Sequence, residues 1–375
     1  MPEPATARAG ARVDLPQASE RPLTEVYDVA LLDLDGVVYL GRAAVPGAPE
    51  ALAEARHRGM RLAFVTNNAS RSSSAIAAQL TSLGVPATPA EVVTSAHAAA
   101  RLIADRLPPG APVLVVGGIG LRIALRERGL RPVSTAAEQP AAVVQGYGPG
   151  IDYPMLAEAG LAVRAGAWYV AANADATLPT ARGIQPGNGS LVQVIVTATG
   201  QQPVVAGKPE PPLHSEAVTR TGARRPLVVG DRLDTDIEGA VRVGADSLLV
   251  LTGVTRPADV VLAPRHRRPR YLARDLAGLL ESHPAVTAAE GSFRCRGWTA
   301  RVVREAGGPD GRPDSDGRTD SGVRPEPGGP PGRLEITGAG APIDGLRALC
   351  AAAWSAGPAA ADSVKSAVAA LRFPA

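Results

Sequence analysis

The feature that most constrains this fold is an alternation of short apolar runs with segments of helical periodicity. The runs 26–32 and 61–65 are predicted to be buried strands, and the segments 48–58 and 72–83 are predicted to be helices that end at glycines. Strands and helices that alternate in this way form a parallel sheet with helices on both faces. We therefore predict an α/β protein with a Rossmann-like, doubly wound parallel sheet.

Changes in composition along the 375 residues predict several domains. The predicted parts are a flexible tail (1–26), a core built from two segments (27–91 and 203–285), an α/β unit inserted between them (92–202), and a small C-terminal α+β module (286–375). Within the last part, residues 307–332 are rich in Gly, Pro and Asp, and we predict that this low-complexity stretch is disordered.

Composition argues against several classes of protein. The net charge is only +3 and basic residues are not interleaved with aromatic ones, so no nucleic-acid partner is expected. Two cysteines, Cys295 and Cys350, do not make a disulfide framework and fit a reducing compartment. No apolar run reaches bilayer-spanning length, and the first residues lack the apolar segment of a secretory signal. We expect a cytoplasmic protein without a membrane span.

Two carboxylates follow the first predicted strand directly. Asp33 and Asp35 stand two residues apart before Gly36, where the backbone can turn sharply. Active sites of open α/β sheets form at such strand ends. One carboxylate can attack an electrophile while the other moves a proton. The alternative is an ordinary Asx turn before a glycine.

Hydrogen-bond donors follow the second strand and a later turn. Thr66, Asn67 and Asn68 offer a hydroxyl and amide groups that suit phosphate oxygens, although a plain helix-capping segment has the same composition. Lys208, between Gly207 and Pro209, is one of only two lysines in the chain. Such a lysine can neutralise charge on a transferring phosphoryl group, and the alternative is an exposed loop lysine.

More carboxylates follow a later apolar run. Asp231 comes directly after Gly230, and Asp234 and Asp236 lie in the same loop. Mg²⁺ prefers oxygen ligands and needs only one or two carboxylates beside phosphate oxygens and water. The alternative is an acidic helix N-terminus, which the helix dipole favours.

In this order, D-x-D-G, T-N-N, G-K-P and G-D-R-x-x-T-D-I resemble the motifs of the haloacid dehalogenase-like hydrolase superfamily, over residues 27–285. The resemblance implies a phosphatase in which Asp33 is the nucleophile that forms an aspartyl-phosphate, and Asp35 is the general acid and then the base. It implies further that the phosphoryl oxygens are held by Thr66, Asn67, Asn68 and Lys208, that Mg²⁺ is bound by Asp33, the Asp35 carbonyl and Asp231, and that Asp236 stands behind the metal or contacts it through water.

The position of the insertion resembles that of the class-II (subclass IIA) capped phosphatases, because it falls between the second and third motifs. Asn173 and Asp175, with residues 186–190, resemble the cap-closing segments of that group. The resemblance makes Asn173 and Asp175 candidates for a supporting role at the site, and a purely structural role in the loop stays open. Relatives of this kind often dimerise through the cap, so a homodimer is possible.

The C-terminal module resembles a partial acetyltransferase-like fold, an extension typical of actinobacterial phosphatases that act on glycerol 3-phosphate. This resemblance implies hydrolysis of glycerol 3-phosphate to glycerol and phosphate in glycerophospholipid recycling. The alternative substrates are phosphoglycolate, p-nitrophenyl phosphate and nucleoside monophosphates. A non-catalytic binding protein with the same fold is the alternative from another class, and the presence of Asp33, Asp35, Lys208 and Asp231 argues against it.

Overall fold

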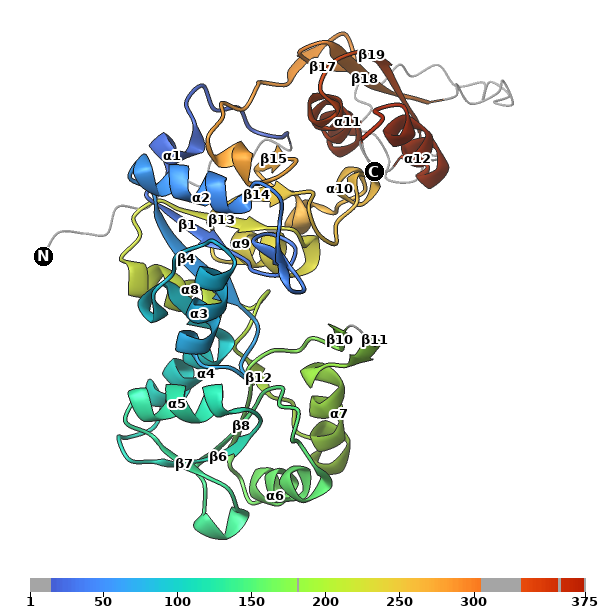
Figure 1. Ribbon diagram of the computed structural model, residues 1–375. Coiled ribbons are helices and arrows are strands. Elements are labelled where there is room, and N and C mark those ends of the chain that lie inside the picture. The colour runs from blue at the N-terminus through green and yellow to red at the C-terminus, as the bar shows by residue number, and fades with distance from the viewer. Residues whose placement is uncertain (1–14, 181, 305–331, 357–358, 374–375) are drawn as a thin grey trace, which may run out of the picture. The chain divides into compact units, whose positions relative to one another are not determined.

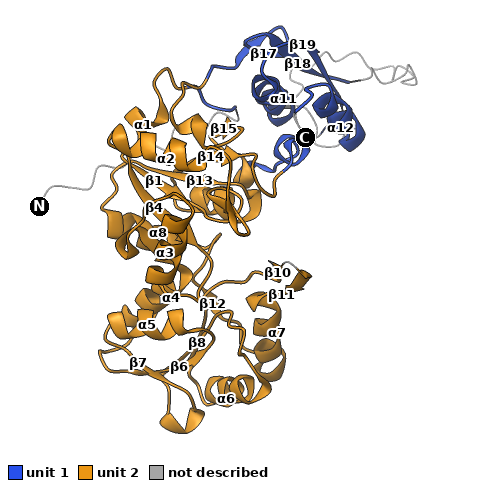
Figure 2. Ribbon diagram, viewed as in Figure 1, with its two compact units in different colours: residues 1–18, 256–265, 284–375 blue, residues 19–255, 266–283 orange. Residues whose placement is uncertain are grey.

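The computed structural model describes residues 15–180, 182–304, 332–356 and 359–373. The chain divides into two compact units (Figure 2). Residues 19–255 and 266–283 fall in the larger unit, and residues 256–265 and 284–375 fall in the smaller one. Across the described residues, no helix has both the length and the apolar character needed to cross a membrane.

The first sheet of the larger unit has six parallel strands in the order β15-β14-β13-β1-β4-β5 (Figure 1). Their bounds are Val29–Leu32 (β1), Arg61–Thr66 (β4), Val92–Thr94 (β5), Pro226–Gly230 (β13), Asp246–Val250 (β14) and Tyr271–Ala273 (β15). This parallel sheet confirms the predicted α/β fold class. The first pair of strands, β1 and β4, is joined through a helix, as the alternation in the sequence predicts.

Helices cover both faces of this sheet because successive strand residues point to opposite sides. Ala30 and Leu32 of β1 face one apolar layer, which includes residues of α2 and α3. Val29 and Leu31 face the other layer, with residues of α4, α8 and α9. The helix bounds are Ala48–His57 (α2), Ser73–Ser82 (α3), Ser95–Ala104 (α4), Pro211–Thr221 (α8) and Glu238–Arg242 (α9).

The inserted unit, called the cap below, has its own parallel sheet of five strands in the order β12-β9-β8-β6-β7. Helix α5 contributes to the apolar layer on one face, and α6 and α7 contribute to the layer on the other. The bounds are Pro112–Val116 (β6), Arg131–Val133 (β7), Ala142–Gln145 (β8), Trp168–Ala171 (β9), Val204–Val205 (β12), Ile119–Glu127 (α5), Tyr153–Arg164 (α6) and Asn188–Thr199 (α7), with a hairpin of Thr177–Thr180 (β10) and Gly183–Pro186 (β11).

The sheets place both ends of the cap differently from the sequence-based boundaries. Val92–Thr94, predicted as the start of the insertion, pairs with β4 and is the edge strand of the core sheet. Val204–Val205, predicted as core, pairs with β9 in the cap sheet. Both strands are very short, so their sheet membership depends on pairing with distant segments, which a local pattern does not specify.

The smaller unit contains an antiparallel sheet in the order β16-β17-β18-β19, with α11 packed against β17 and β18. Its elements are Thr287–Ala289 (β16), Ser292–Cys295 (β17), Trp298–Val303 (β18), Arg333–Gly338 (β19), Pro257–Val261 (α10), Pro342–Ala356 (α11) and Ala361–Ala369 (α12). Arg296, at φ +49°, opens a tight turn, and residues 292–303 fold as a hairpin of β17 and β18. The predicted disordered loop lies almost wholly in 305–331, outside the described residues.

The predicted tail over 1–26 extends too far. Residues 1–14 lie outside the described part, but Leu23–Val26 forms a short helical turn (α1), and Leu23 is fully buried. The remaining small strands, Tyr39–Leu40 (β2) and Ala43–Ala44 (β3), form a ribbon just after β1. Apolar residues among the last of the predicted tail thus belong to the core.

Two buried histidines make the stability of the larger unit sensitive to acid. Burial lowers the pKa of His97 to about 3, with Arg220 and Arg128 adding to the effect. Burial, and then Lys208, lowers the pKa of His214 to about 3. The unfolded chain takes up these protons below a pH of about 6.5, whereas the folded chain does not until far lower pH, so stability is lost as pH falls through this window, by about 1.4 kcal/mol per pH unit for each histidine.

The acid sensitivity can be measured as the fall in melting temperature between pH 7.5 and pH 5. His97→Gln is expected to reduce that fall, because glutamine takes up no proton in this pH range. The amide oxygen can replace Nδ1 as the acceptor for the Thr94 N–H, at 3.1 Å in the structure, so the fold is expected to survive. His57→Gln, at an exposed position, serves as the control and should leave the fall unchanged. An unchanged pH dependence in His97→Gln would remove His97 as a cause.

Candidate active site

The order of the core strands brings three of the predicted motifs to one edge of the sheet. Strand β1 lies between β13 and β4, with Leu32 opposite Val229 and Phe64. The residues that follow these strands, Asp33, Asn67 and Asp231, therefore come out side by side. The Asp33 N–H donates to the carbonyl of Val229 at 2.8 Å, which extends the ladder by one bond to the first carboxylate.

Lys208 lies at the centre of this edge and is 4% exposed. Its Nζ donates to Asp33 Oδ1 at 2.5 Å, to Asp236 Oδ1 at 2.6 Å and to the carbonyl of Val65 at 3.4 Å. Burial acts to lower the pKa of Lys208, but the carboxylates of Asp236 and then Asp33 overcome it, so the pKa is raised. The lysine is therefore a fixed cation against the proposed nucleophile, not an exposed loop residue.

Three carboxylates around Lys208 are suited to hold a cation. Asp33, Asp231 and Asp236 each place one oxygen within 4.8 Å of the others. In the described part of the chain, Asp231 Oδ1 is buried without a hydrogen-bond partner, while Oδ2 accepts from the Val254 N–H at 2.6 Å. Burial, and then the Asp236 charge, raises the pKa of Asp231 to about 6, against the opposing effects of the Val254 hydrogen bond and of Lys208. A hard divalent cation fits these oxygens.

The hydrogen bonds separate Asp236 from the other two acids. Asp236 Oδ1 is taken by Lys208, and Oδ2 accepts from the Arg232 N–H at 3.2 Å. Asp33 and Asp231 each keep an oxygen that no protein hydrogen bond described above occupies. Asp33 and Asp231 would hold the cation directly, and Asp236 would orient Lys208 beside it.

Two glycines leave room for Asp231. A Cβ on Gly36 would lie 2.5 Å from Asp231 Oδ2, and one on Gly253 would lie 2.0 Å from the same atom. Gly36 also has φ +87°, in the left-handed region that side chains disfavour. The glycine of the D-x-D-G motif is thus required twice, by the turn and by the carboxylate packed on it.

Gly36→Ala is expected to weaken Mg²⁺ binding and kcat/KM by about tenfold to a hundredfold, because Asp231 must move away from the added methyl group. Gly41→Ala is the matched control, since Gly41 also has a positive φ, +60°, but has no atom within 4 Å of the added Cβ. Calorimetric Mg²⁺ titration and steady-state kinetics measure both variants. Equal losses in the two would show that backbone strain alone is responsible.

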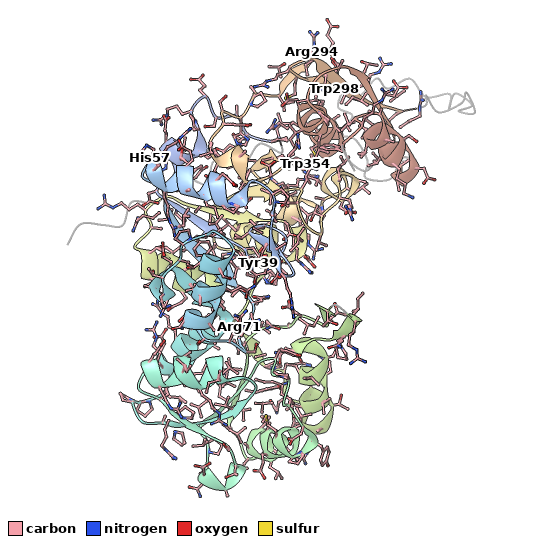
Figure 3. The ribbon with its side chains drawn as sticks, in the orientation of Figure 1. Tyr39, His57, Arg71, Arg294, Trp298 and Trp354 are labelled. Atoms are coloured by element: carbon pink, nitrogen blue, oxygen red, sulfur yellow. The ribbon has the colours of Figure 1, made fainter. Side chains whose placement is uncertain are left out.

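Asp35 lies on the turn between β1 and β2, two residues after Asp33. Its side chain is solvent-exposed, yet desolvation by the surrounding protein raises the pKa of its carboxyl group. The Lys208 charge opposes this shift. The Tyr39 hydroxyl hydrogen-bonds to the Asp35 carboxylate, and the Arg71 charge also acts on it. Figure 3 shows Tyr39 and Arg71 on the side of the core toward the cap. A carboxyl group with a raised pKa suits proton donation.

The side chains of the second motif, Thr66, Asn67 and Asn68, hydrogen-bond mainly to nearby backbone. Thr66 is buried, and its Oγ1 accepts from the Asn68 N–H at 3.1 Å. Asn68 Oδ1 accepts from the N–H groups of Ser70 and Arg71 and from the Ser70 hydroxyl, so it shapes the turn into α3. The Asn67 side chain bonds to the backbone of Lys208 and to Asp175 of the cap.

The structure brings the two cap candidates to this edge of the core. Asn173, 4% exposed, donates from Nδ2 to the carbonyl of Asn67 at 2.7 Å. The Asp175 N–H donates to Asn173 Oδ1 at 3.2 Å, and both carboxylate oxygens of Asp175 lie 3.2 Å from Asn67 Nδ2. Burial raises the pKa of Asp175, and the hydrogen bond from Asn67 opposes this. The cap therefore reaches Asn67 but not the three clustered acids by any hydrogen bond described here.

Several residues near the site escaped the motif-based reasoning. Tyr39 contacts Asp35, the Ser95 hydroxyl donates to the Asn67 carbonyl at 2.6 Å, and the Thr252 hydroxyl donates to the Gly36 carbonyl at 2.6 Å. Gly253, which packs against Asp231, lies only after the next core strand, β14. Residues that follow the strands of a parallel sheet lie at one edge of it. Applied to the strands that end at Thr94 and Val250, this rule would have pointed to residues 95 and 252–254.

A parallel α/β core with a nucleophile-type carboxylate, a buried lysine and a cation cluster at its strand ends, and an inserted α/β cap, defines a capped phosphoryl-transfer hydrolase. Comparison with known proteins agrees. Family models described as haloacid dehalogenase-like hydrolase and HAD-hydrolase-like match residues 30–131 and 205–279, and one described as a GCN5-related N-acetyltransferase-like domain matches residues 330–372.

The chain is 51% identical to the D-glycerol 3-phosphate phosphatase of Mycobacterium tuberculosis over 267 residues, 71% of this chain and 75% of that protein. It is 40% identical to a 5′-nucleotidase of Bacillus subtilis over 62% of this chain and 90% of that protein. The crystal structure of an M. tuberculosis glycerol phosphate phosphatase in complex with magnesium matches with a TM-score of 0.78 and 41% identity, over 94% of this chain and 99% of that one. The chain belongs to the haloacid dehalogenase-like hydrolases.

Proposed function

We propose that this protein is a Mg²⁺-dependent phosphomonoester hydrolase that works through an aspartyl-phosphate on Asp33. The observation that carries the proposal is the arrangement of Asp33, Asp231 and Asp236 around buried Lys208, with one Asp231 oxygen buried and free of hydrogen bonds from the described residues. Bound there, Mg²⁺ would supply charge neutralisation for the phosphate dianion.

The proposed reaction has two steps. In the first, an Asp33 carboxylate oxygen attacks phosphorus, the bond from phosphorus to the alcohol oxygen breaks, and Asp35 gives its proton to that oxygen. In the second, Asp35 takes a proton from water, whose oxygen attacks phosphorus and releases Asp33 and inorganic phosphate. Lys208 lies 2.5 Å from Asp33 and favours its ionised form against the burial that raises the pKa of Asp33.

Glycerol 3-phosphate is the substrate that we propose. The M. tuberculosis glycerol phosphate phosphatase matches 94% of this chain, including the C-terminal unit. By contrast, the chain matches a nitrophenylphosphatase of Geobacillus stearothermophilus over only 67% of its own length, at 36% identity. The shared architecture therefore supports glycerol phosphate over the nucleotide and nitrophenyl esters named for other relatives.

The test is phosphate release with Mg²⁺ from a panel of esters, with Asp33→Asn as the blank. The panel holds both glycerol 3-phosphate enantiomers, phosphoglycolate, p-nitrophenyl phosphate and nucleoside monophosphates. A kcat/KM for one glycerol phosphate enantiomer well above all others supports the proposal. Higher values for another ester would replace the substrate, and release from none would favour the non-catalytic binding protein.

A homodimer and a cytoplasmic location remain part of the proposal. The cap carries exposed apolar side chains on α6 and α7, Leu161 and Val194, at 58% and 46% exposure. Light scattering of the purified chain measures its mass in solution. A mass close to the 38.3 kDa of one chain at all concentrations would exclude the dimer.

A further inference from the structure

We propose that Asp175 of the cap is a positioning residue: it fixes the Asn67 side chain, and through Asn67 the backbone that carries Lys208. The inference rests on the proposed function, because it concerns how the same phosphate site is assembled. It assigns Asp175 no contact with substrate. Its consequence is that the core residues reach their working positions only when the cap is seated on them.

The Asn67 side chain is fully hydrogen-bonded between Lys208 and the cap. A carboxamide has two N–H donors and one carbonyl acceptor. Asn67 Nδ2 donates to the Lys208 carbonyl at 3.1 Å and to the two Asp175 oxygens at 3.2 Å, while Oδ1 accepts from the Lys208 N–H at 2.8 Å. Both donors and the acceptor are used, so this side chain is a brace between Lys208 and the cap. It is not a free donor to phosphoryl oxygens, as the family motif alone suggested.

The cap loop that follows β9 is held in place by side-chain hydrogen bonds. Asn188, 1% exposed, donates from Nδ2 to the Asn173 carbonyl at 2.7 Å, and Asn173 Oδ1 accepts from the Asp175 N–H. Asn173 also donates to the Asn67 carbonyl. The loop that follows β9 is thus held from inside the cap and meets Asn67 at two points, through its carbonyl and its side chain. Two hydrogen bonds to one residue, both partly buried, fix its orientation as well as its distance from the cap.

The backbone at Gly207 packs closely against both the cap and Asn67. A Cβ on Gly207 would lie 2.5 Å from the carbonyl oxygen of Ala172 and 2.7 Å from Asn67 Oδ1. The segment that carries Lys208 is therefore pressed between the end of cap strand β9 and Asn67. Because β12 of the cap sheet ends at Val205, only two residues separate that sheet from Lys208. A movement of the cap would therefore shift the backbone that carries Lys208.

The charge on Asp175 argues for positioning rather than for substrate binding. A carboxylate close to a site for a phosphate dianion repels it unless a donor covers it. Here the Asn67 amide covers both Asp175 oxygens, and the charges of Lys208 and Arg232 act on the same carboxylate. Its bond to Asn67 makes the carboxylate compatible with a site for anions.

The test is a double-mutant cycle with Asp175→Ala and Asn67→Ala. If Asp175 acts through Asn67, each single variant lowers kcat/KM by about tenfold to a hundredfold, and the double variant is little worse than the poorer single one. The loss should be the same for glycerol 3-phosphate and p-nitrophenyl phosphate, because Asp175 does not touch the leaving alcohol. Asp175→Asn, which keeps one carbonyl acceptor, should recover part of the loss. Asp105→Ala, at an exposed carboxylate directly after α4, is the matched control and should behave as the wild type.

Two results would overturn the proposal: multiplicative losses in the double variant, or a loss confined to one leaving group. Calorimetric binding of inorganic phosphate in Mg²⁺ repeats the cycle without turnover. It therefore decides the positioning role even if the chain hydrolyses none of the esters, and it separates failure of this inference from failure of the proposed function. Circular dichroism and melting curves identify a variant that does not fold, in which case Asn67→Ser replaces Asn67→Ala in the cycle.

Discussion

Asp33→Asn is expected to lower phosphate release by about 10⁴-fold or more, the scale found when an enzyme loses its nucleophile. The amide cannot form the acyl-phosphate, and it no longer pairs as an anion with Lys208. The change keeps the size of the side chain, and Lys208 retains Asp236 at 2.6 Å, so the fold is expected to survive. Phosphate release with saturating glycerol 3-phosphate measures the effect, and the melting curve checks the fold.

Asp28→Asn is the matched control for this loss. Asp28 lies just before the same strand, at the opposite edge of the sheet, where its oxygens accept from the N–H groups of Arg224 and Arg225 at 2.9 Å. The amide oxygen can still accept there, so activity should stay close to that of the wild type. Turnover by Asp33→Asn at wild-type rates would refute the covalent mechanism.

Removal of Mg²⁺ with excess EDTA is expected to lower turnover by at least about a hundredfold, and added Mg²⁺ should restore it. Without the cation, four carboxylates, Asp33, Asp35, Asp231 and Asp236, surround a site in which Lys208 makes the only ion pairs with them that the structure describes. These acids would repel a phosphate dianion. Phosphate release across a series of free Mg²⁺ concentrations measures the dependence.

A chelator pre-loaded with Mg²⁺ is the control for effects of EDTA itself. A second readout needs no turnover: Mg²⁺ should bind to the wild type in calorimetry and should bind more weakly to Asp231→Asn, because the unpartnered Oδ1 is replaced or turned away. Full activity in excess EDTA would remove the metal from the mechanism. Unchanged Mg²⁺ affinity in Asp231→Asn would move the metal site elsewhere.

Much of the fold followed from local patterns because the buried strands are continuous apolar runs with clear ends. The strands predicted over 26–32 and 61–65 correspond to β1 and β4, and the helix predicted at 48–58 matches α2 to within one residue. In these segments the apolar period and the terminal glycines point to the same structure.

The errors fell where pairing partners are distant. Val92–Thr94 was predicted in the cap but lies in the core sheet, and Val204–Val205 was predicted in the core but lies in the cap sheet. Each pairs with a strand many residues away in the sequence. The hairpin within 292–303 turns at Arg296 and Gly297, and of these two residues only the glycine favours a turn. Leu23 is buried although it follows a polar, proline-containing segment, since its neighbours come from the core.

The residues that indicate the chemistry could be found from sequence alone: Asp33 and Asp231 directly after apolar runs, Thr66 at the end of another, and a rare lysine after the insertion. Their motifs also pointed to one hydrolase superfamily. Residue type and spacing along one strand are local properties, so they are legible in a single chain. How these groups combine became clear only from the folded chain. It placed Lys208 between Asp33 and Asp236, left Asp231 Oδ1 without a partner among the described residues, and joined Asn67 to Asp175 of the cap. These relations depend on distances between segments far apart in the chain, which are set by sheet order and packing and by no local pattern.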